Sequence, residues 1–531
     1  MFVRSPYLVI HPLAPPHISV RLFKVAARKE INYAVKVRPL APCDDCNEYR
    51  LCVAQARVTD SQQQSAFSQT MFFLEIFDFY RKDHDYIRHL VWKWHIPAHV
   101  CQRWRQVVFA SPHRLNLQIL CTYGTPVRKN LSIWPAFPIV LDYRYSRRHV
   151  TLNDEDDVVA TFEHPNRVCY LGLDITGSQL GKMATVMQGP FPVLTHLHIV
   201  LKDGNASVLP GEFLGGSAPC LQVIYLRGIP FPTLPSLLLS TSDLVKLHLF
   251  NMPPTGYISP EAMVACLALL PSLQNFVIGF QLATSRPDRI HPPPITRTVL
   301  PVLTSFEFKG ANEYLEDLVA RIDSPQLDRI YIDYLNQIVD LQVAQLSKFI
   351  DRSVGPELTQ FRHAQIGFIS GWSTFTMYRH ANQPSSDRYS ATTVISCKGI
   401  DWQVFHMAQV LSQFSAILSN VVHLDLEAAL EEDHQIEDDV EWLHLLHQFS
   451  TVKVLRVAHE LAGHVALALE DITEETVAEA LPSLDLIYLE GQKASSIEKF
   501  VAVRQLNGRP VIVIDTETEF DERFESYYVS E

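Results

Sequence analysis

The stretch that decides the fold is FPVLTHLHI, residues 191–199, in which Leu194, Leu197 and Ile199 form an apolar triplet with the spacing L-x-x-L-x-L. The phrase recurs as VCYLGL at Val168, LQVIYL at Leu221, LVKLHL at Leu244, LQNFVI at Leu273, LTSFEF at Leu303, LDRIYI at Leu327, VVHLDL at Val421, VKVLRV at Val452 and LDLIYL at Leu484. Its first positions lie 26, 27, 23, 29, 30 and 24 residues apart up to Leu327, then 31 and 32 apart from Val421 onward. This regular spacing indicates a repeat.

The phrase is typical of leucine-rich repeats, whose apolar anchors enter a stacked core while a short strand lines a concave surface. Helical stretches between the phrases, such as SPEAMVACLAL from Ser259 and NEYLEDLVARI from Asn312, would form the outer side. Ser259 followed by Pro260 is a plausible helix start. We therefore expect an α/β solenoid, a leucine-rich-repeat-like right-handed horseshoe. An ordinary α/β domain whose strands share leucines is the alternative, and it explains the spacing less well.

One interval interrupts the repeat, between Leu327 and Val421. Two weaker stretches, residues 358–361 and 392–397, have comparable spacing and would bridge it as further repeats.

Composition narrows the class of protein. The chain has 531 residues, of which 47% are hydrophobic and 19% charged, and this is typical of a folded protein. A net charge of -13 excludes a global basic surface for nucleic acid and favours a protein partner. The chain has nine cysteines without a signal-peptide pattern, and no apolar run long enough to cross a bilayer. We therefore expect a protein of the cytoplasm or nucleus, with no membrane and no nucleic-acid partner.

Motifs for catalysis, cofactors and metals are missing. No phosphate-binding glycine loop and no G-x-S-x-G elbow is present. His459 and His464 in HELAGH are separated by five positions, which places them on different sides of a helix. Cys43 and Cys46 have metal-like spacing but lack a second pair, and the acidic run at 427–442 lacks the order of a calcium loop. We expect no enzyme and no cofactor, although a catalytic triad assembled from distant positions stays open.

The strands also predict which side chains face the concave surface. These are His196, His198, Tyr225, Arg227, His248, Phe250, Lys309, Arg329, Tyr331 and Asp333. Aromatic residues and arginines often anchor protein interfaces, so six of them form the candidate target surface: Tyr225, Arg227, His248, Phe250, Arg329 and Tyr331. The alternative is that they are only the strand-face residues that any such solenoid has.

Two stretches before the repeats, FLEIFDFY at 73–80 and HVCQRWRQV at 99–107, resemble the two best-marked pieces of an F-box. Their order, followed by a linker and irregular leucine-rich repeats, is similar to that of the F-box proteins of mushroom-forming fungi. The resemblance implies a small all-helical module that binds the adaptor subunit of SCF-type ubiquitin ligases. The residues that match the motif, and would form the adaptor-binding and self-packing surface, are Leu74, Ile76, Phe77, Val100, Cys101 and Trp104. Ser68-Gln69 replaces the family's Leu-Pro, which would weaken or abolish adaptor binding.

These observations divide the chain into five expected parts: a poorly ordered leader (1–66), an F-box-like module (67–120), a linker and solenoid cap (121–165), the solenoid (166–512) and an acidic tail (513–531). The function this implies is a non-catalytic substrate receptor of an SCF ubiquitin ligase, with a protein target on the repeat surface. The alternative is an interaction or scaffold protein outside any ligase, in which the degenerate F-box only caps the repeats.

Overall fold

The computed structural model describes residues 70–75, 77, 95–112, 114–123, 127–134, 136–144, 152–204, 208–282, 296–335, 342–353, 361–369, 371–378, 390–396, 400–429, 440–470, 481–490 and 497–516. The expected leader lies outside these ranges, as do residues 517–531 of the expected tail. The described residues belong to two compact units, a small helical one that includes residues 95–111 and a large one that runs from residue 112.

The small unit consists of helices. Residues 70–75 and 77 are helical, and α3 (His95–Val100) and α4 (Gln102–Ala110) follow. Cys101 is the N-cap of α4, and its Sγ accepts a hydrogen bond from the backbone N–H of Trp104 at 3.5 Å. The Nε of Arg105 donates to the carbonyl of Ala98 at 2.9 Å, which ties α4 to α3.

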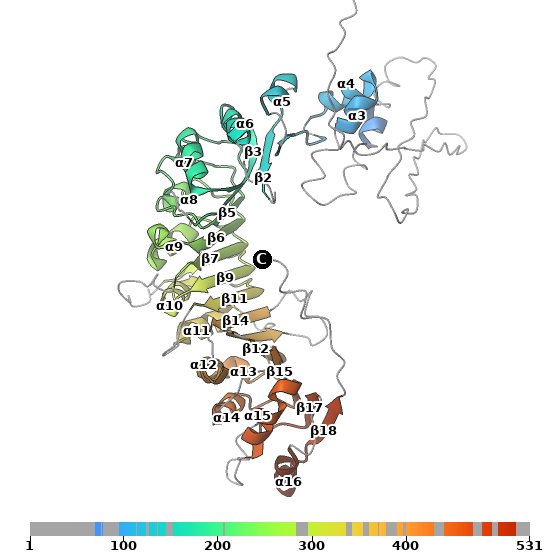
Figure 1. Cartoon of the computed structure of the whole chain (residues 1–531), viewed down its shortest axis with the longest axis vertical. Coiled ribbons are helices and arrows are strands. Elements are labelled where there is room, and N and C mark those ends of the chain that lie inside the picture. The colour runs from blue at the N-terminus through green and yellow to red at the C-terminus, as the bar shows by residue number, and fades with distance from the viewer. Residues whose placement is uncertain are drawn as a thin grey trace, which may run out of the picture. The chain divides into compact units, whose positions relative to one another are not determined.

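The large unit is built on a sixteen-stranded sheet with the order β1-β2-β3-β4-β5-β6-β7-β9-β11-β14-β13-β12-β15-β16-β17-β18 (Figure 1). Its strands are β1 (Ile119–Cys121), β2 (Ile139–Tyr143), β3 (Val168–Ile175), β4 (His196–Leu201), β5 (Val223–Arg227), β6 (Lys246–Met252), β7 (Asn275–Phe280), β9 (Ser305–Gly310), β11 (Arg329–Tyr334), β12 (His363–Ile369), β13 (Trp372–Tyr378), β14 (Ser390–Ser396), β15 (His423–Ala429), β16 (Val454–Val457), β17 (Leu486–Glu490) and β18 (Ile512–Thr516). β8 (Thr298–Val299) and β10 (Ile322–Asp323) form a separate parallel pair.

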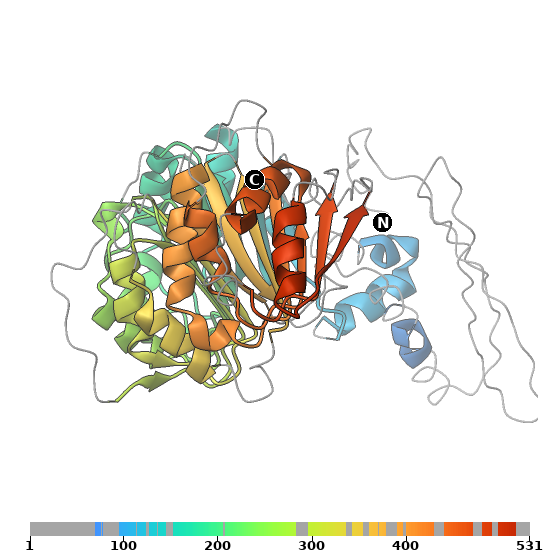
Figure 2. The same cartoon turned by 90° about the horizontal axis from the view of Figure 1, so that it is seen from below.

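Helices alternate with these strands and cover one face of the sheet, as Figures 1 and 2 show. They are α5 (Val127–Ile133), α6 (Leu152–Phe162), α7 (Gly177–Val186), α8 (Leu234–Leu238), α9 (Pro260–Leu267), α10 (Asn312–Val319), α11 (Ala344–Ser353), α12 (Ile400–Ser412), α13 (Ser415–Leu418), α14 (Val440–Leu446), α15 (His459–Glu470) and α16 (Glu498–Leu506), with 3-10 turns at Phe213–Gly216 and Pro254–Gly256. We call the other side of the sheet the open face. Among the described helices, none has the length and apolar character needed to span a membrane.

The apolar anchors of the repeated phrase form the core between the sheet and the helices. In FPVLTHLHI the anchors Leu194, Leu197 and Ile199 are all fully buried, and the anchors of every other phrase are buried as well. Residues between the anchors are more exposed, so β4 alternates strictly between the two faces. The predicted strand-and-helix solenoid is confirmed, while its handedness and horseshoe curvature stay predictions.

The interval between Leu327 and Val421 differs from the expectation of two further parallel repeats. β12, β13 and β14 form an antiparallel meander, inserted so that β14 pairs with β11 and β12 pairs with β15. Ile369 pairs with Trp372 across a two-residue connection that contains Gly371. The φ of Gly371 is 98°, in the positive-φ region that favours glycine over other residues. The tight turn leads the chain directly into β13, which takes the place of the helix between the two expected strands, while α12 still follows β14.

The sheet also extends beyond the expected solenoid, residues 166–512, at both ends. β1 crosses from the stretch assigned to the helical module into the first residue of the expected linker, and β2 lies inside that linker, yet both pair in parallel with their neighbours. At the other end β18 includes residues 513–516, which the acidic composition had assigned to the tail, and it pairs with β17. Neither terminal strand carries the full repeated phrase, so the pattern could not reveal them.

Helix starts are fixed by side chains that satisfy free backbone N–H groups. Ser259 is the N-cap of α9 as predicted, and its Oγ accepts from the N–H of Ala262 at 3.3 Å. Glu316 of α10 accepts from the N–H groups of Gln345 and Leu346 at 2.7 and 2.8 Å, so one repeat caps the helix of the next. Burial raises the pKa of Glu316 to about 7, against the lowering effect of these two hydrogen bonds.

Candidate interaction surface

The open face presents rows of side chains, because neighbouring parallel strands are in register. One row is Tyr170, His196, Val223, Lys246, Asn275, Ser305 and Arg329. The adjacent row is Asp142, Gly172, His198, Tyr225, His248, Val277, Glu307 and Tyr331. Arg227 of β5 pairs with Phe250 of β6 beyond the second row. Chemistry along the face is therefore set by which residue each repeat places between its anchors.

Six rings on β3 to β6 form two neighbouring groups of contacting rings, the pair Tyr170–His196 and the cluster of His198, Tyr225, His248 and Phe250, which together we call the aromatic ladder. The imidazole of His198 stacks on the ring of Tyr225, with centroids 4.1 Å apart and planes 8° from parallel. The Tyr225 centroid lies 5.0 Å from that of Phe250 and 6.0 Å from that of His248. Tyr225 is thus the central ring, and offset or edge contacts of this kind stabilise the group beyond simple burial.

Arg144 closes the β2 end of the ladder. Its Nε donates to Asp142 Oδ1 at 2.8 Å and a second nitrogen donates to Oδ2 at 3.2 Å. The guanidinium carbon lies 5.1 Å from the centroid of the Tyr170 ring. A Cβ at Gly172 would come within 2.9 Å of Arg144 Nε, so the arginine can lie across this strand only because position 172 is glycine.

The ladder histidines are neutral near pH 7. Burial, followed by the positive charge of Arg144, lowers the pKa of His198 to about 4. Burial and then Lys246 lower the pKa of His248 to about 4, and the pKa of His196 falls for the same reasons. The Nε2 of His248 is buried and has no hydrogen-bond partner. The ladder is therefore an uncharged surface that can take part in ring stacking.

Exposed cations flank these neutral rings. Arg227 and Lys246 are both exposed at the ladder's β5 and β6 strands. Asp142 is engaged by Arg144, so it does not offset them. The ladder thus combines apolar ring faces with positive charge in a chain whose net charge is -13.

The open face changes character on β9 and β11. Lys309 Nζ lies 2.6 Å from Asp333 Oδ2, and burial followed by Asp333 raises the pKa of Glu307. Arg329 and Tyr331 are exposed beside this group. We call these five residues the polar segment. Lys309 and Asp333 satisfy each other as an ion pair, and the carboxyl of Glu307 lies close enough to Asp333 for its pKa to be raised further.

A third group lies further along the open face, on β12, β13 and β15. Gln365 Nε2 donates to Glu427 Oε2 at 2.5 Å, and the Tyr378 hydroxyl donates to Gln365 Oε1 at 2.6 Å. The rings of His363 and His423 stack with centroids 4.4 Å apart. Among the described residues, no three His, Cys, Asp or Glu side chains are placed to hold a metal ion.

The structure brings together four of the six predicted target-surface residues, Tyr225, Arg227, His248 and Phe250. Arg329 and Tyr331 lie three strands further along the sheet and belong to the polar segment. Sequence reasoning missed Tyr170, Arg144 and the role of Gly172. Tyr170 occupies the same place in VCYLGL as His196 does in LTHLHI, so the repeat alignment could have found it. Arg144 follows a strand without the full phrase and gave no such signal.

The predicted adaptor-binding residues fall into two groups in the small unit. Leu74, Phe77 and Trp104 are buried, and the Phe77 and Trp104 ring centroids are 5.1 Å apart in an edge contact. Val100 is half-buried and Cys101 is exposed. Ile76 lies outside the described residues. Three of the matched positions therefore hold the unit together, which leaves Val100 and Cys101 nearer its surface.

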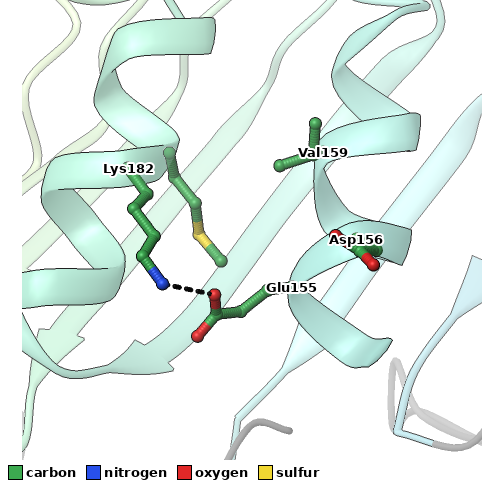
Figure 3. Close-up of a pocket in the computed structure, with 5 residues that line it drawn as sticks. Glu155, Asp156, Val159 and Lys182 are labelled. Carbon is green, nitrogen blue, oxygen red and sulfur yellow. Dashed lines mark hydrogen bonds and ion pairs between the residues drawn. The ribbon is translucent and has the colours of Figure 1, made fainter. Parts of the chain in front are cut away.

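A pocket of about 390 Å³ lies on the helical side, between α6 and α7 (Figure 3). Lys182 Nζ is 3.1 Å from Glu155 Oε2, and Gln179 Nε2 donates to Glu155 Oε1 at 2.8 Å. Lys182 and Glu155 thus form an ion pair in this pocket, which Asp156 also lines.

Comparisons with known proteins give weak likenesses. No protein-family model matches the chain, and no curated protein matches it. Among solved structures it is similar to the leucine-rich repeat-containing protein LegL7 from Legionella pneumophila, at 12% identity and a TM-score of 0.24 over 75% of this chain and 99% of that one. It is also similar to a chain of the TLR13-ssRNA13 complex, at 14% identity and a TM-score of 0.29 over 72% of this chain and 48% of that one. The repeat fold therefore rests on strand register and anchor burial.

Proposed function

We propose that the chain is a non-catalytic receptor that binds a protein target through the aromatic ladder and docks on the adaptor subunit of an SCF-type ubiquitin ligase through its small helical unit. The observation that carries the first part is the stacking of His198, Tyr225 and Phe250 on the sheet face opposite the described helices of the large unit. Rigid rings of this kind supply contact area at low entropic cost. Such a receptor needs no catalytic residue, because it acts by bringing a target close to another protein's active site.

The target segment that best fits the ladder is acidic and carries aromatic or apolar side chains. Its rings would stack on Tyr225 and Phe250, and its carboxylates would meet the exposed Arg227 and Lys246. The neutral histidines add ring surface without adding charge. The polar segment is less suitable, because Lys309 and Asp333 already satisfy each other.

The experiment for the target surface is selection from a phage-displayed library of random peptides on the intact chain. We expect enrichment of peptides that combine Asp or Glu with Phe, Tyr or Trp. Their binding should be lost with Tyr225→Ala and weakened with Arg227→Glu, whereas the matched change Tyr331→Ala in the polar segment should leave it intact. Peptides that bind Tyr225→Ala as well as the natural chain would contradict the proposal.

Support for the adaptor role comes from the F-box resemblance and from the packing of Phe77 on Trp104. Since Leu74, Phe77 and Trp104 are buried, their substitution would test folding instead of docking. Val100→Asp places a charge at the half-buried last residue of α3 and should abolish capture of the purified adaptor subunit. Cys101→Ser is the matched control, because serine keeps the cap of α4 and should preserve capture.

Two results would contradict the adaptor role. If the natural, folded chain does not bind the purified adaptor, the helical unit is only a cap and the chain is an interaction protein outside any ligase. If Val100→Asp binds as the natural chain does, docking does not use this surface. Either result leaves the peptide-binding test of the open face unaffected.

A further inference from the structure

The neighbouring strands β5 and β6 present three rows of side chains on the open face, which we call the β5–β6 block (Figure 1). Row by row, its members are Val223 and Lys246, Tyr225 and His248, and Arg227 and Phe250. The ring centroids of Tyr225, His248 and Phe250 lie 5.0, 5.8 and 6.0 Å apart, so these three rings contact one another. The exposed Lys246 and Arg227 therefore stand at opposite ends of a ring cluster.

Backbone hydrogen bonds fix both ends of the β5–β6 block. At the first row the N–H of Lys246 donates to the carbonyl of Gln222 at 3.0 Å. Beyond the third row the N–H of Gly228 donates to the carbonyl of Phe250 at 2.9 Å. Gly228 and Asn251 have positive φ angles of 73° and 49°, which interrupt the extended backbone directly after the third row. The block is thus three rows long, about 13 Å from the first row to the third.

We propose that the β5–β6 block binds an extended segment of the target that lies along these two strands and carries an acidic residue two positions before and two positions after an aromatic residue. This inference rests on the proposed function, because it specifies the segment that the aromatic ladder recognises. The ring of the segment lies on Tyr225 and His248, and its two carboxylates meet Lys246 and Arg227. The support is charge complementarity, since among the described residues no carboxylate forms an ion pair with either cation.

The repeat of an extended chain selects this pattern. Side chains of an extended segment face the same way at every second residue, roughly 6.6 Å apart, and neighbouring rows of the block have the same separation. Three facing positions of the segment therefore meet all three rows. A helix fits less well, because residues four apart lie about 6 Å apart along its axis but rotate by about 40° at each step. The third position of a helix would turn away from the sheet.

A second block with the same layout, on β9 and β11, shows why the charges must be available. It has Lys309 in its third row and Arg329 in its first, again at opposite ends. However, Lys309 lies 2.6 Å from Asp333, and Glu307 occupies the middle row in place of a second ring. An acidic segment would lose one of its two cations here and would face a carboxyl. Arg329 is therefore the matched control for Arg227, since both arginines are exposed.

The first test varies the spacing of the acidic residues. Synthetic peptides of glycine and serine with one phenylalanine and two glutamates are passed over the immobilised intact chain, and binding is measured by surface plasmon resonance. The peptide with glutamate two positions from the phenylalanine on each side should bind at least about fivefold more tightly than peptides with adjacent glutamates or with glutamates four positions away. Tyr225→Ala should remove this binding, because the peptide then loses the central ring.

Charge reversal tests where each carboxylate lies. Arg227→Glu and Lys246→Glu should each weaken the best peptide by about three- to tenfold, and Arg329→Glu should leave its affinity unchanged. Exchange of one peptide glutamate for lysine should restore binding to one of the two weakened variants, and exchange of the other glutamate should restore binding to the other variant. Circular dichroism should show that all three variants are folded, because the substituted side chains are exposed.

Failure of this inference and failure of the proposed function give different results. Equal binding of all spacings, or rescue of both variants by the same peptide end or by neither, would overturn the extended arrangement while binding still depends on Tyr225. So would a lack of binding by every designed peptide when peptides from the random library bind through Tyr225. If Tyr225→Ala leaves all peptide binding unchanged, the ladder is not the target surface, and the inference and that part of the proposed function are both wrong.

Discussion

The aromatic ladder and the polar segment are neighbours on one sheet, built on the same repeat, yet they satisfy their side chains in different ways. In the ladder, Tyr225 contacts the rings of His198 and Phe250, and among the described residues no carboxylate forms an ion pair with the exposed Arg227 or Lys246. In the polar segment, Lys309 and Asp333 pair at 2.6 Å. Two stretches with the same backbone geometry therefore differ in how many of their polar groups remain available to bind a partner.

The difference shows what a repeat fold leaves free to vary. The anchors fix the strand positions, and the residues between them can change without cost to the core. Stacked neutral rings are already rigid and partly desolvated, so a partner loses little entropy or hydration on contact. A partner that contacts paired charges must either separate them or supply new partners for them, and desolvating these charges is unfavourable. We therefore expect recognition to concentrate on the ladder.

The largest expected effect is the loss of stability when a side chain is truncated in the core that both regions share. Leu247→Ala under the ladder and Phe306→Ala under the polar segment should each lower the free energy of unfolding by about 2–5 kcal/mol, because both side chains are fully buried. Urea unfolding followed by circular dichroism measures it. A loss below about 1 kcal/mol at either site would mean that the two regions do not rest on one continuous core.

The second-largest expected effect is a difference in peptide affinity between substitutions in the ladder and in the polar segment. Tyr225→Ala should weaken a ladder-binding peptide by about 2 kcal/mol, or roughly thirtyfold, because it removes the central ring. Tyr331→Ala should change the affinity less than about threefold. Isothermal titration calorimetry with one selected peptide gives both values. Equal losses at the two positions would show that the binding surface extends over both regions.

The ladder should also make stability depend on pH. The pKa values of His198 and His248 are lowered to about 4, so the unfolded chain takes up these protons first as pH falls from about 6.5. Their contribution is complete above pH 6.5 and is lost progressively down to about pH 4, by roughly 1–2 kcal/mol after a discount for solvent screening of these partly exposed rings.

A His198→Phe, His248→Phe double variant isolates the contribution of these two histidines to the pH dependence of stability. The difference in free energy of unfolding between pH 7 and pH 4.5 should be smaller for the double variant than for the natural chain. The carboxyls of Glu307 and Glu316, whose pKa values are raised by burial, act in the opposite direction in both proteins and therefore cancel in the comparison. An unchanged pH dependence would contradict the depressed histidine pKa values.

The smallest effect concerns the polar segment. Lys309→Met should lower the free energy of unfolding by at most about 1 kcal/mol, because the lysine is partly exposed and water can replace it beside Asp333. Raising the salt concentration should shrink the difference between the two proteins. Thermal unfolding at low and high salt measures this, with Lys309→Arg as a control that keeps the charge. A salt-independent loss would indicate a packing role for the lysine stem instead.

The sequence predicted the repeat because burial imposes a strict local pattern. Each anchor, such as Leu197 or Leu247, must be apolar to enter the core, and the strand period then fixes which residues face outward. The same logic predicted Tyr225, His248 and Phe250 on the open face. It could not predict the antiparallel meander, because an alternating strand such as β13 gives the same pattern in either direction.

By itself, then, the sequence determined the solenoid, its anchors and the outward position of the candidate residues, since these follow from local periodicity and from the cost of exposing apolar groups. Only the tertiary structure decided which outward residues meet. The stacking of His198 on Tyr225, the place of Arg144 over Gly172 and the separation of Tyr331 from the ladder all depend on strand order and register. Those are set by contacts between segments far apart in the chain, and no local pattern encodes them.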